Sequence, residues 1–210
     1  MKLARMQTPE GIVTGQYEES TLIAGDGEYT PGRDGVVTYP CSPSALYCVG
    51  RNFAATLDQM DYDRPDEPDF FIKPPASLVG PEKPVRYPAW TAELTYAGEL
   101  VAVIDQRCRD VAPAAVPDVV RGYTVMNDVD ALDQQGRTAR EPRQSATTAQ
   151  MLFDPHEVVS FISRRFTLRP GDAIAFGSPA NPGTIEPGDT IEITYEGVGT
   201  LTNSVVRADK

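Results

Sequence analysis

The chain is poor in the side chains that most often perform acid–base chemistry or bind transition metals, with one histidine and three cysteines among 210 residues. The cysteines, Cys41, Cys48 and Cys108, are odd in number and irregularly spaced, which argues against a disulfide framework or a zinc site. Reduced thiols in a cytoplasmic protein are the simplest interpretation. The only histidine, His156, falls at the start of an expected helix, where a partly exposed and non-catalytic role is expected.

Basic residues and long apolar runs are also scarce. The sequence has 19 Lys plus Arg against 30 Asp plus Glu, a net charge of -11. This balance disfavours nucleic acid and anionic membranes as partners, because both require basic patches. No apolar run is long enough to span a membrane, and no apolar signal core follows the first residues. We therefore expect a cytoplasmic protein whose partner is a small molecule.

Turn-forming residues, by contrast, are abundant, with 19 prolines and 17 glycines. Few segments show a long helical periodicity, and the length allows one substantial core with a small appended lobe. We expect a mostly β (α+β) fold with a few short helices. Residues 1–40 are predicted to form a small N-terminal antiparallel β lobe, and residues 41–210 the main domain.

The local pattern predicts where the elements lie. Strands are expected at 11–17, 20–24, 45–50, 70–75 (ending in a proline turn), 96–104, 122–129, 173–176, 191–195 and from 197 onward. Short helices are expected to begin within 51–57, at 116–120 and at 154–162, where Asp154 suits the N-cap and Pro155 the first helical position. An acidic segment, 61–69, and a polar segment, 134–150, are predicted as loops.

Several short motifs occur in an order that resembles the fumarylacetoacetate hydrolase (FAH) family. They are Cys-Val-Gly-Arg-Asn-Phe-Ala at 48–54, Phe-Phe-Ile-Lys-Pro at 70–74, Gly-Tyr-Thr-Val-Met-Asn-Asp-Val at 122–129, Gly-Ser-Pro at 177–179, Pro-Gly-Asp at 170–172 and 187–189, and Glu-Gly-Val-Gly-Thr-Leu at 196–201. Each motif alone is weak, but together they span nearly the whole chain. The resemblance implies a mixed β-roll core and commonly a homodimer.

The same resemblance implies a Mg²⁺ or Mn²⁺ ion bound by three carboxylates, two of them in a Glu-x-Glu pair on one strand. Residues i and i+2 of a strand point to one face, about 6.6 Å apart, so such a pair can aim at one cation. In this chain the first position is Ala97, the second is Glu99, and the third carboxylate is Asp128. We expect no cofactor, or weak Mg²⁺ or Mn²⁺ binding at Glu99 and Asp128.

Other catalytic positions implied by the resemblance are also changed. Hydrolytic members use a His–Glu dyad on a short helix as general base, and those positions here hold Thr56 and Gln59. A longer, lysine-bearing insert is represented only by the lysine-free segment 134–150, in which Arg137, Arg140 and Arg143 are alternative sources of positive charge. The metal-dependent hydrolase machinery is therefore expected to be incomplete.

We accordingly predict a divergent, metal-independent isomerase, cyclase or lyase acting on an enol, dicarbonyl or polyketide-like small molecule. The predicted catalytic residues are Arg51, Lys73, Glu99 and Asp128, and the predicted substrate-binding residues are Asn52, Tyr123, Asn127 and Ser178. For each of these a structural role is the alternative; for Arg51, for example, it is an ion pair with Asp128. Two other functions stay open: a Mg²⁺-dependent hydrolase, decarboxylase or isomerase of 2-oxo acids with an incomplete site, and a non-catalytic paralogue subunit.

Overall fold

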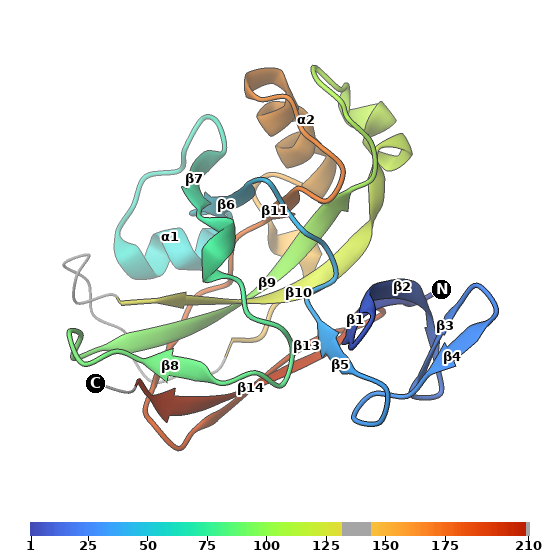
Figure 1. Cartoon of the computed structure of the whole chain (residues 1–210). Helices are drawn as coiled ribbons and strands as arrows, with labels where there is room; N and C mark the ends of the chain where they lie inside the picture. Colours follow the sequence, from blue (N-terminus) through green and yellow to red (C-terminus); the bar gives the residue numbers. More distant parts are fainter. Residues whose placement is uncertain (132–143, 209–210) are drawn as a thin grey trace.

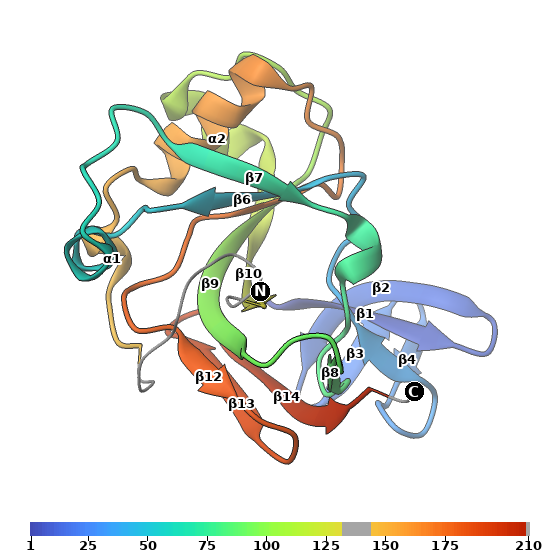
Figure 2. The ribbon, with the colours of Figure 1, turned by 90° about the vertical axis from the view of Figure 1, so that its left-hand side faces the viewer.

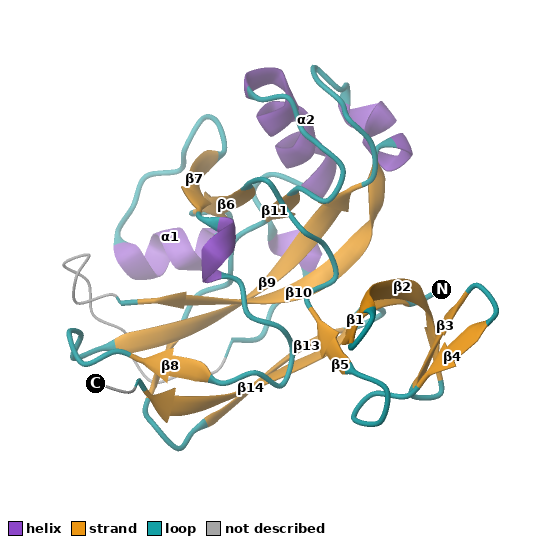
Figure 3. Ribbon diagram, viewed as in Figure 1, coloured by secondary structure: helices purple, strands orange, loops and turns teal. Residues whose placement is uncertain are grey.

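A computed structural model describes residues 1–131 and 144–208, and strands dominate it (Figures 1 and 3). The strands are β1 (Leu3–Thr8), β2 (Gly11–Glu18), β3 (Thr21–Ala24), β4 (Gly27–Tyr29), β5 (Val36–Thr38), β6 (Leu46–Gly50), β7 (Asp69–Lys73), β8 (Val85–Tyr87), β9 (Leu94–Ile104), β10 (Val120–Asp130), β11 (Ala173–Ala175), β12 (Gly183–Ile185), β13 (Thr190–Tyr195) and β14 (Gly199–Arg207). The helices are α1 (Ala54–Met60) and α2 (Pro155–Arg165), with 3-10 turns at Pro75–Ser77, Pro113–Asp118 and Thr148–Gln150. The predicted mostly β class is confirmed.

The first five strands form a sheet of their own in the order β4-β3-β2-β1-β5, with every pair antiparallel. Its interior holds Met6 and Leu22, both without exposed surface. The strands predicted at 11–17 and 20–24 are confirmed as β2 and β3, whereas β1, β4 and β5 were not anticipated. The division of the chain into two domains stays a prediction.

The main sheet has the order β10-β9-β11-β6-β7 and is mixed, because β6 and β11 run parallel while its other pairs are antiparallel. A second sheet, β13-β14-β8, lies beneath it (Figures 1 and 2). Strand β9 has two successive partners within the main sheet, because its late part pairs with β11 and its early part with β12. This arrangement rolls the strands around a shared interior.

The sequence of β9 explains why it is buried on both faces. Leu100, Ala102 and Ile104 pack into a core that includes Val158 and Ile162 of α2. Alternate residues of the same strand, such as Val101 and Val103, pack into a second core on the opposite face. Because both faces of such a strand are buried, its sequence is a continuous apolar run, as it is from Leu100 to Ile104.

Helix α2 begins as predicted. Asp154 accepts hydrogen bonds from the backbone N–H groups of His156 and Glu157, and the Glu157 carboxylate accepts one from the N–H of Asp154. This reciprocal capping box satisfies N–H groups that would otherwise lack partners at the start of a helix. His156 contributes its backbone N–H to this capping box, and the non-catalytic role expected for it stays a prediction.

Some local predictions need correction. The helix expected at 116–120 is a 3-10 turn ending at Asp118, and Val120 already begins β10. In the predicted loop 134–150, residues 148–150 form a 3-10 turn, and residues 132–143 lie outside the described part of the chain. Strands β8 and β12 were missed because three residues are too few to show a period of two. In the described ranges, no helix is long and apolar enough to cross a membrane.

Candidate active site

The three positions that correspond to the family's carboxylates lie on one face of the β9–β10 pair. Asp128 is directly opposite Ala97, and the next pair on that face joins Met126 and Glu99. Side chains that face each other across an antiparallel pair point to the same side of the sheet. The strand register therefore brings Glu99 and Asp128 together, with the Ala97 methyl group beside them.

Glu99 is buried in a gap in the strand pairing of β9. The chain leaves β11 after Ala175 and rejoins β9 only at Gly183, so residues 176–182 cross over this stretch without strand pairing. There the Gly177 N–H donates to the Glu99 Oε2 at 3.1 Å, and Glu99 is 4 % exposed. A carboxyl group in this position is separated from water but not from hydrogen-bond donors.

Lys73 supplies the positive charge of the site. Its Nζ forms an ion pair with Asp128, lies 3.0 Å from the Asp130 Oδ1 and donates to the Val129 carbonyl at 3.2 Å. Lys73 ends β7 and Asp128 belongs to β10, the two edge strands of the main sheet. Their contact requires the sheet to curl until its two edges approach each other.

Burial and the neighbouring charge act in the same direction on the pKa of Glu99, and in opposite directions on the pKa values of Asp128 and Lys73. Burial and then the neighbouring Asp128 raise the pKa of Glu99 well above its usual value, against the hydrogen bond from Gly177. Burial likewise raises the pKa of Asp128, and the Lys73 ammonium partly opposes that rise. Burial alone would lower the pKa of Lys73, but Asp128 and Asp130 together raise it above its usual value. The site thus favours a charged lysine beside carboxyl groups that hold protons more tightly than in water.

The raised pKa of Glu99 predicts a pH dependence of stability. A carboxyl group whose pKa is higher in the folded than in the unfolded protein favours folding least at high pH, where the buried group must ionise. Its contribution therefore falls as pH rises from the unfolded value near 4.5 through the folded value. Urea unfolding of the Glu99→Gln variant between pH 4.5 and 8.5 should show a gain relative to wild type that grows with pH. If the free energy of unfolding depended on pH in the same way in both proteins, this would contradict a raised pKa of Glu99.

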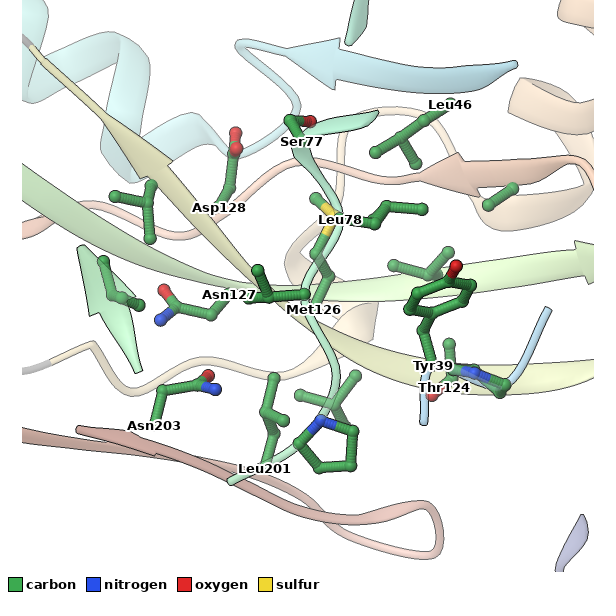
Figure 4. A pocket seen from close by; sticks show the side chains of 18 of the residues that line it. Tyr39, Leu46, Ser77, Leu78, Thr124, Met126, Asn127, Asp128, Leu201 and Asn203 are labelled. Carbon is green, nitrogen blue, oxygen red and sulfur yellow. The ribbon is translucent and has the colours of Figure 1, made fainter. Parts of the chain in front are cut away.

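A cavity of about 840 Å³ opens along the free edge of β10, next to this site (Figure 4). Lys73, Met126, Asn127 and Asp128 all contribute to its wall. Because β10 has a strand partner on one side only, the cavity reaches residues from both faces of this strand. Glu99 does not line it and lies behind Asp128 and Met126.

The other predicted site residues lie apart from the cavity. Arg51 pairs with Asp69 at 2.9 Å near the surface, so the alternative pairing with Asp128 is wrong: Lys73 occupies that carboxylate. Asn52 bonds the Phe176 and Phe153 carbonyls and the Phe153 N–H, which uses its whole carboxamide on the backbone.

Tyr123 and Ser178 are also placed away from the cavity. Tyr123 is 41 % exposed, and its ring centroid lies 6.4 Å from that of Phe176. The Ser178 carbonyl accepts a hydrogen bond from the Thr56 hydroxyl. No described contact of these two residues reaches Lys73, so their substrate contact stays a prediction.

Sequence reasoning named Gln59 only as a changed catalytic position and did not anticipate the contacts that brace the segment 176–182. Gln144 accepts from the Gly98 N–H at 2.8 Å and donates to the Pro179 carbonyl at 2.7 Å, which links β9 to this segment. Gln59 accepts from the Asn181 N–H. Tyr195 donates to the Gly98 carbonyl, and burial followed by the Glu99 charge raises its pKa to about 12. No local pattern marks these residues, because each contact joins segments far apart in sequence.

The side chains present do not fit a three-carboxylate metal site. Ala97 offers no donor atom, Asp128 is already engaged by the Lys73 ammonium, and one Glu99 oxygen accepts from Gly177. Metal ligation requires deprotonated carboxylates, whereas burial raises the pKa of Glu99 well above its usual value. The described residues contain no group of three or more His, Cys, Asp or Glu side chains that could hold a metal ion. We therefore derive no chemical step through a metal.

Comparison with known proteins agrees with this architecture. The family model "Fumarylacetoacetate (FAA) hydrolase C-terminal" matches residues 45–140 and 131–206, and the chain belongs to this family. Protein Rv2993c from Mycobacterium tuberculosis is 33% identical over 264 residues, covering 100% of both chains.

Two solved structures are similar over their whole length. The 5-carboxymethyl-2-hydroxymuconate delta-isomerase from Mycobacterium smegmatis is 33% identical, with a TM-score of 0.87 and 100% of both chains covered. The 2-hydroxyhepta-2,4-diene-1,7-dioate isomerase from Mycobacterium marinum is also 33% identical, with a TM-score of 0.83 and the same coverage. The fold and the family are thus established.

Proposed function

We propose that this protein is an isomerase that converts the enol form of a 2-hydroxy-dienoic acid, or of a related dicarbonyl compound, into its keto isomer without a metal ion. The observation that carries the proposal is the buried Lys73–Asp128 ion pair at the wall of the cavity, with Glu99 behind it. Support also comes from two relatives whose names describe isomerases of 2-hydroxylated unsaturated diacids.

The chemistry needs one base, one acid and one group that stabilises a negative oxygen. In the proposed step, Asp128 takes the proton of the enol hydroxyl while the Lys73 ammonium stabilises the resulting enolate oxygen. The protonated Asp128 then returns a proton to a carbon of the same substrate, the C=O bond forms and the C=C bond shifts. No atom is gained or lost. Burial raises the pKa of Asp128, which makes its carboxylate a stronger base for the enol proton.

Glu99 is proposed to act through Asp128 and not on the substrate. It lies behind the cavity wall, and its charge contributes to the electrostatic environment of its neighbour. When Glu99 is protonated, Asp128 ionises more readily because two adjacent carboxylates need not both be charged. Glu99→Gln should therefore shift the pH profile of kcat while leaving KM nearly unchanged.

The decisive experiment follows the loss of the conjugated enol of 2-hydroxymuconate by ultraviolet absorbance. Protein pretreated with EDTA and dialysed should ketonise this enol well above the buffer rate, and added Mg²⁺ or Mn²⁺ should change the rate little. Loss of activity with EDTA and its recovery with Mg²⁺ would instead establish the metal-dependent alternative. No turnover under either condition would favour the non-catalytic paralogue.

We further propose that the protein forms a homodimer. Phe71 and Ile72, 44 % and 51 % exposed, lie on the edge strand β7, where a second copy would remove them from water. Light scattering coupled to size-exclusion chromatography should give twice the mass of 22.8 kDa. A mass of one chain at micromolar concentration would contradict this proposal.

A further inference from the structure

We infer that the carboxylate of Asp130 occupies the place on the Lys73 ammonium group that an anionic oxygen of the substrate takes, and that the substrate displaces it on binding. Asp130 is thus an internal competitor, which sets KM and excludes ligands that cannot displace a carboxylate. The role of the substrate oxygen rests on the proposed isomerase, whereas the competition for Lys73 follows from the contacts of the protein alone.

The hydrogen-bonding capacity of Lys73 is fully used. An ammonium group has three N–H donors, and three acceptors on β10 take them. The Lys73 Nζ contacts the Asp128 carboxylate, lies 3.0 Å from the Asp130 Oδ1 and donates to the Val129 carbonyl at 3.2 Å. No N–H is left over for a ligand in this arrangement. An enolate or carboxylate oxygen can therefore bind the ammonium group only when one of the three acceptors leaves it.

Asp130 is the acceptor that can leave. The Asp128 side chain is 6 % exposed, so its release would strand a charge away from water, whereas the Asp130 side chain is 29 % exposed and can turn into solvent. The Val129 carbonyl belongs to the backbone of β10, which is paired with β9 along this stretch. The Thr95 hydroxyl donates to the backbone carbonyl of Asp130 at 3.2 Å. A change of side-chain rotamer therefore frees Lys73 while the strand stays in place.

The place vacated by Asp130 suits an anionic oxygen next to the proposed base. Asp128 and Asp130 are two residues apart in β10, so both project from one face of the strand and share the same ammonium group. A ligand can reach this group, because Lys73 lines the cavity and its side chain is 18 % exposed. Hydrogen bonds between two charged groups are about twice as strong as neutral ones. A charged oxygen can therefore replace the carboxylate, and a neutral ester carbonyl cannot.

Substitutions at Asp130 test the competition directly. Asp130→Asn keeps the shape and removes the charge, and Asp130→Ala removes the competing oxygens altogether. Asp105→Asn is the matched control, because Asp105 is also a partly exposed carboxylate in an ion pair, with Arg121 at 2.8 Å. Combining Asp130→Asn with Lys73→Met separates competition for the ammonium group from a general effect of negative charge. Lys73→Gln replaces Lys73→Met should that variant not fold.

Binding is measured by isothermal titration calorimetry with trans,trans-muconate, a conjugated diacid that has no enol hydroxyl to ketonise. Asp130→Asn and Asp130→Ala should bind it about 10-fold tighter than wild type, the effect of no longer having to displace one hydrogen bond between charged groups. Asp105→Asn should bind it as wild type does, and the neutral dimethyl ester should gain nothing from any substitution. With Lys73→Met present, Asp130→Asn should give no gain.

Three results of the titrations would overturn the inference. The first is an unchanged or weaker affinity of both Asp130 variants for muconate. The second is a gain of the same size with Lys73→Met present, which would make it a general electrostatic effect on anions. The third is the absence of binding to Asp130→Ala at about 1 mM muconate.

Kinetics with 2-hydroxymuconate distinguish a competitor from a residue that merely holds Lys73 in place. Asp130→Asn should lower KM about 10-fold without a loss in kcat, whereas a supporting role would lower kcat and leave KM the same or higher. The second pattern would overturn the inference and leave the isomerase intact. Tighter binding of muconate that depends on Lys73, with no turnover of the enol by any variant, would refute the isomerase alone.

Discussion

Replacing Lys73 with methionine should lower the free energy of unfolding by about 3 kcal/mol at pH 8, because removing one partner of a buried ion pair leaves the other charge uncompensated. Asp128 is 6 % exposed, and Lys73 is its only ion-pair partner in the described ranges. Without the ammonium group the pKa of Asp128 should rise further. The loss of stability should therefore be largest at high pH and shrink towards pH 5, as Asp128 takes up a proton.

Activity should fall along with stability. If Lys73 stabilises the enolate oxygen, Lys73→Met should reduce kcat by at least about 100-fold, the usual effect of removing one stabilising donor. Urea unfolding at pH 5 and pH 8 and enol turnover at 25 °C measure the two effects. Lys83→Met is the matched control, since Lys83 is exposed and only its backbone is hydrogen-bonded in the described contacts. If Lys73→Met and Lys83→Met changed the free energy of unfolding and kcat by the same amounts, Lys73 would have no specific role in the site.

Gly177→Ala should destabilise the protein by about 3 kcal/mol, because two unfavourable effects combine at this position. The backbone of Gly177 has φ +84, which disfavours any residue with a Cβ, and that Cβ would lie 2.9 Å from the Val49 carbonyl oxygen. Relief of this contact would move the N–H that donates to Glu99. Thermal unfolding and the pH profile of kcat should both change.

Gly188→Ala separates the two effects. Gly188 has a similarly positive φ of +108, but no atom lies within 4 Å of the Cβ that alanine would add. We expect this variant to lose only about 1 kcal/mol, the cost of the strained backbone alone, with no change in the pH profile. A loss as large as that of Gly177→Ala would show that crowding at Val49 has no part in the effect.

The local sequence determined much of the fold and the part of the site that depends on strand register. The apolar run Leu100–Ile104 predicts a strand buried on both faces, and the Asp154–Pro155 pair predicts the start of α2; both are confirmed. Ala97 could be recognised as a changed ligand position through the resemblance to the FAH family, and strand spacing then places it on the same face as Glu99. Such features are visible in the sequence because residues close together in the chain create them.

Only the tertiary structure decided which charges meet and where a ligand has room. Lys73 reaches Asp128 because the main sheet curls until its edge strands approach, a property of the whole sheet and not of either segment. Asn52 and Asn127 have the same side chain. Backbone groups hydrogen-bond to both polar atoms of the Asn52 carboxamide, whereas neither polar atom of Asn127 has a partner among the described residues. The cavity likewise depends on the free edge of β10. These outcomes follow from how distant segments pack, and no local pattern records that packing.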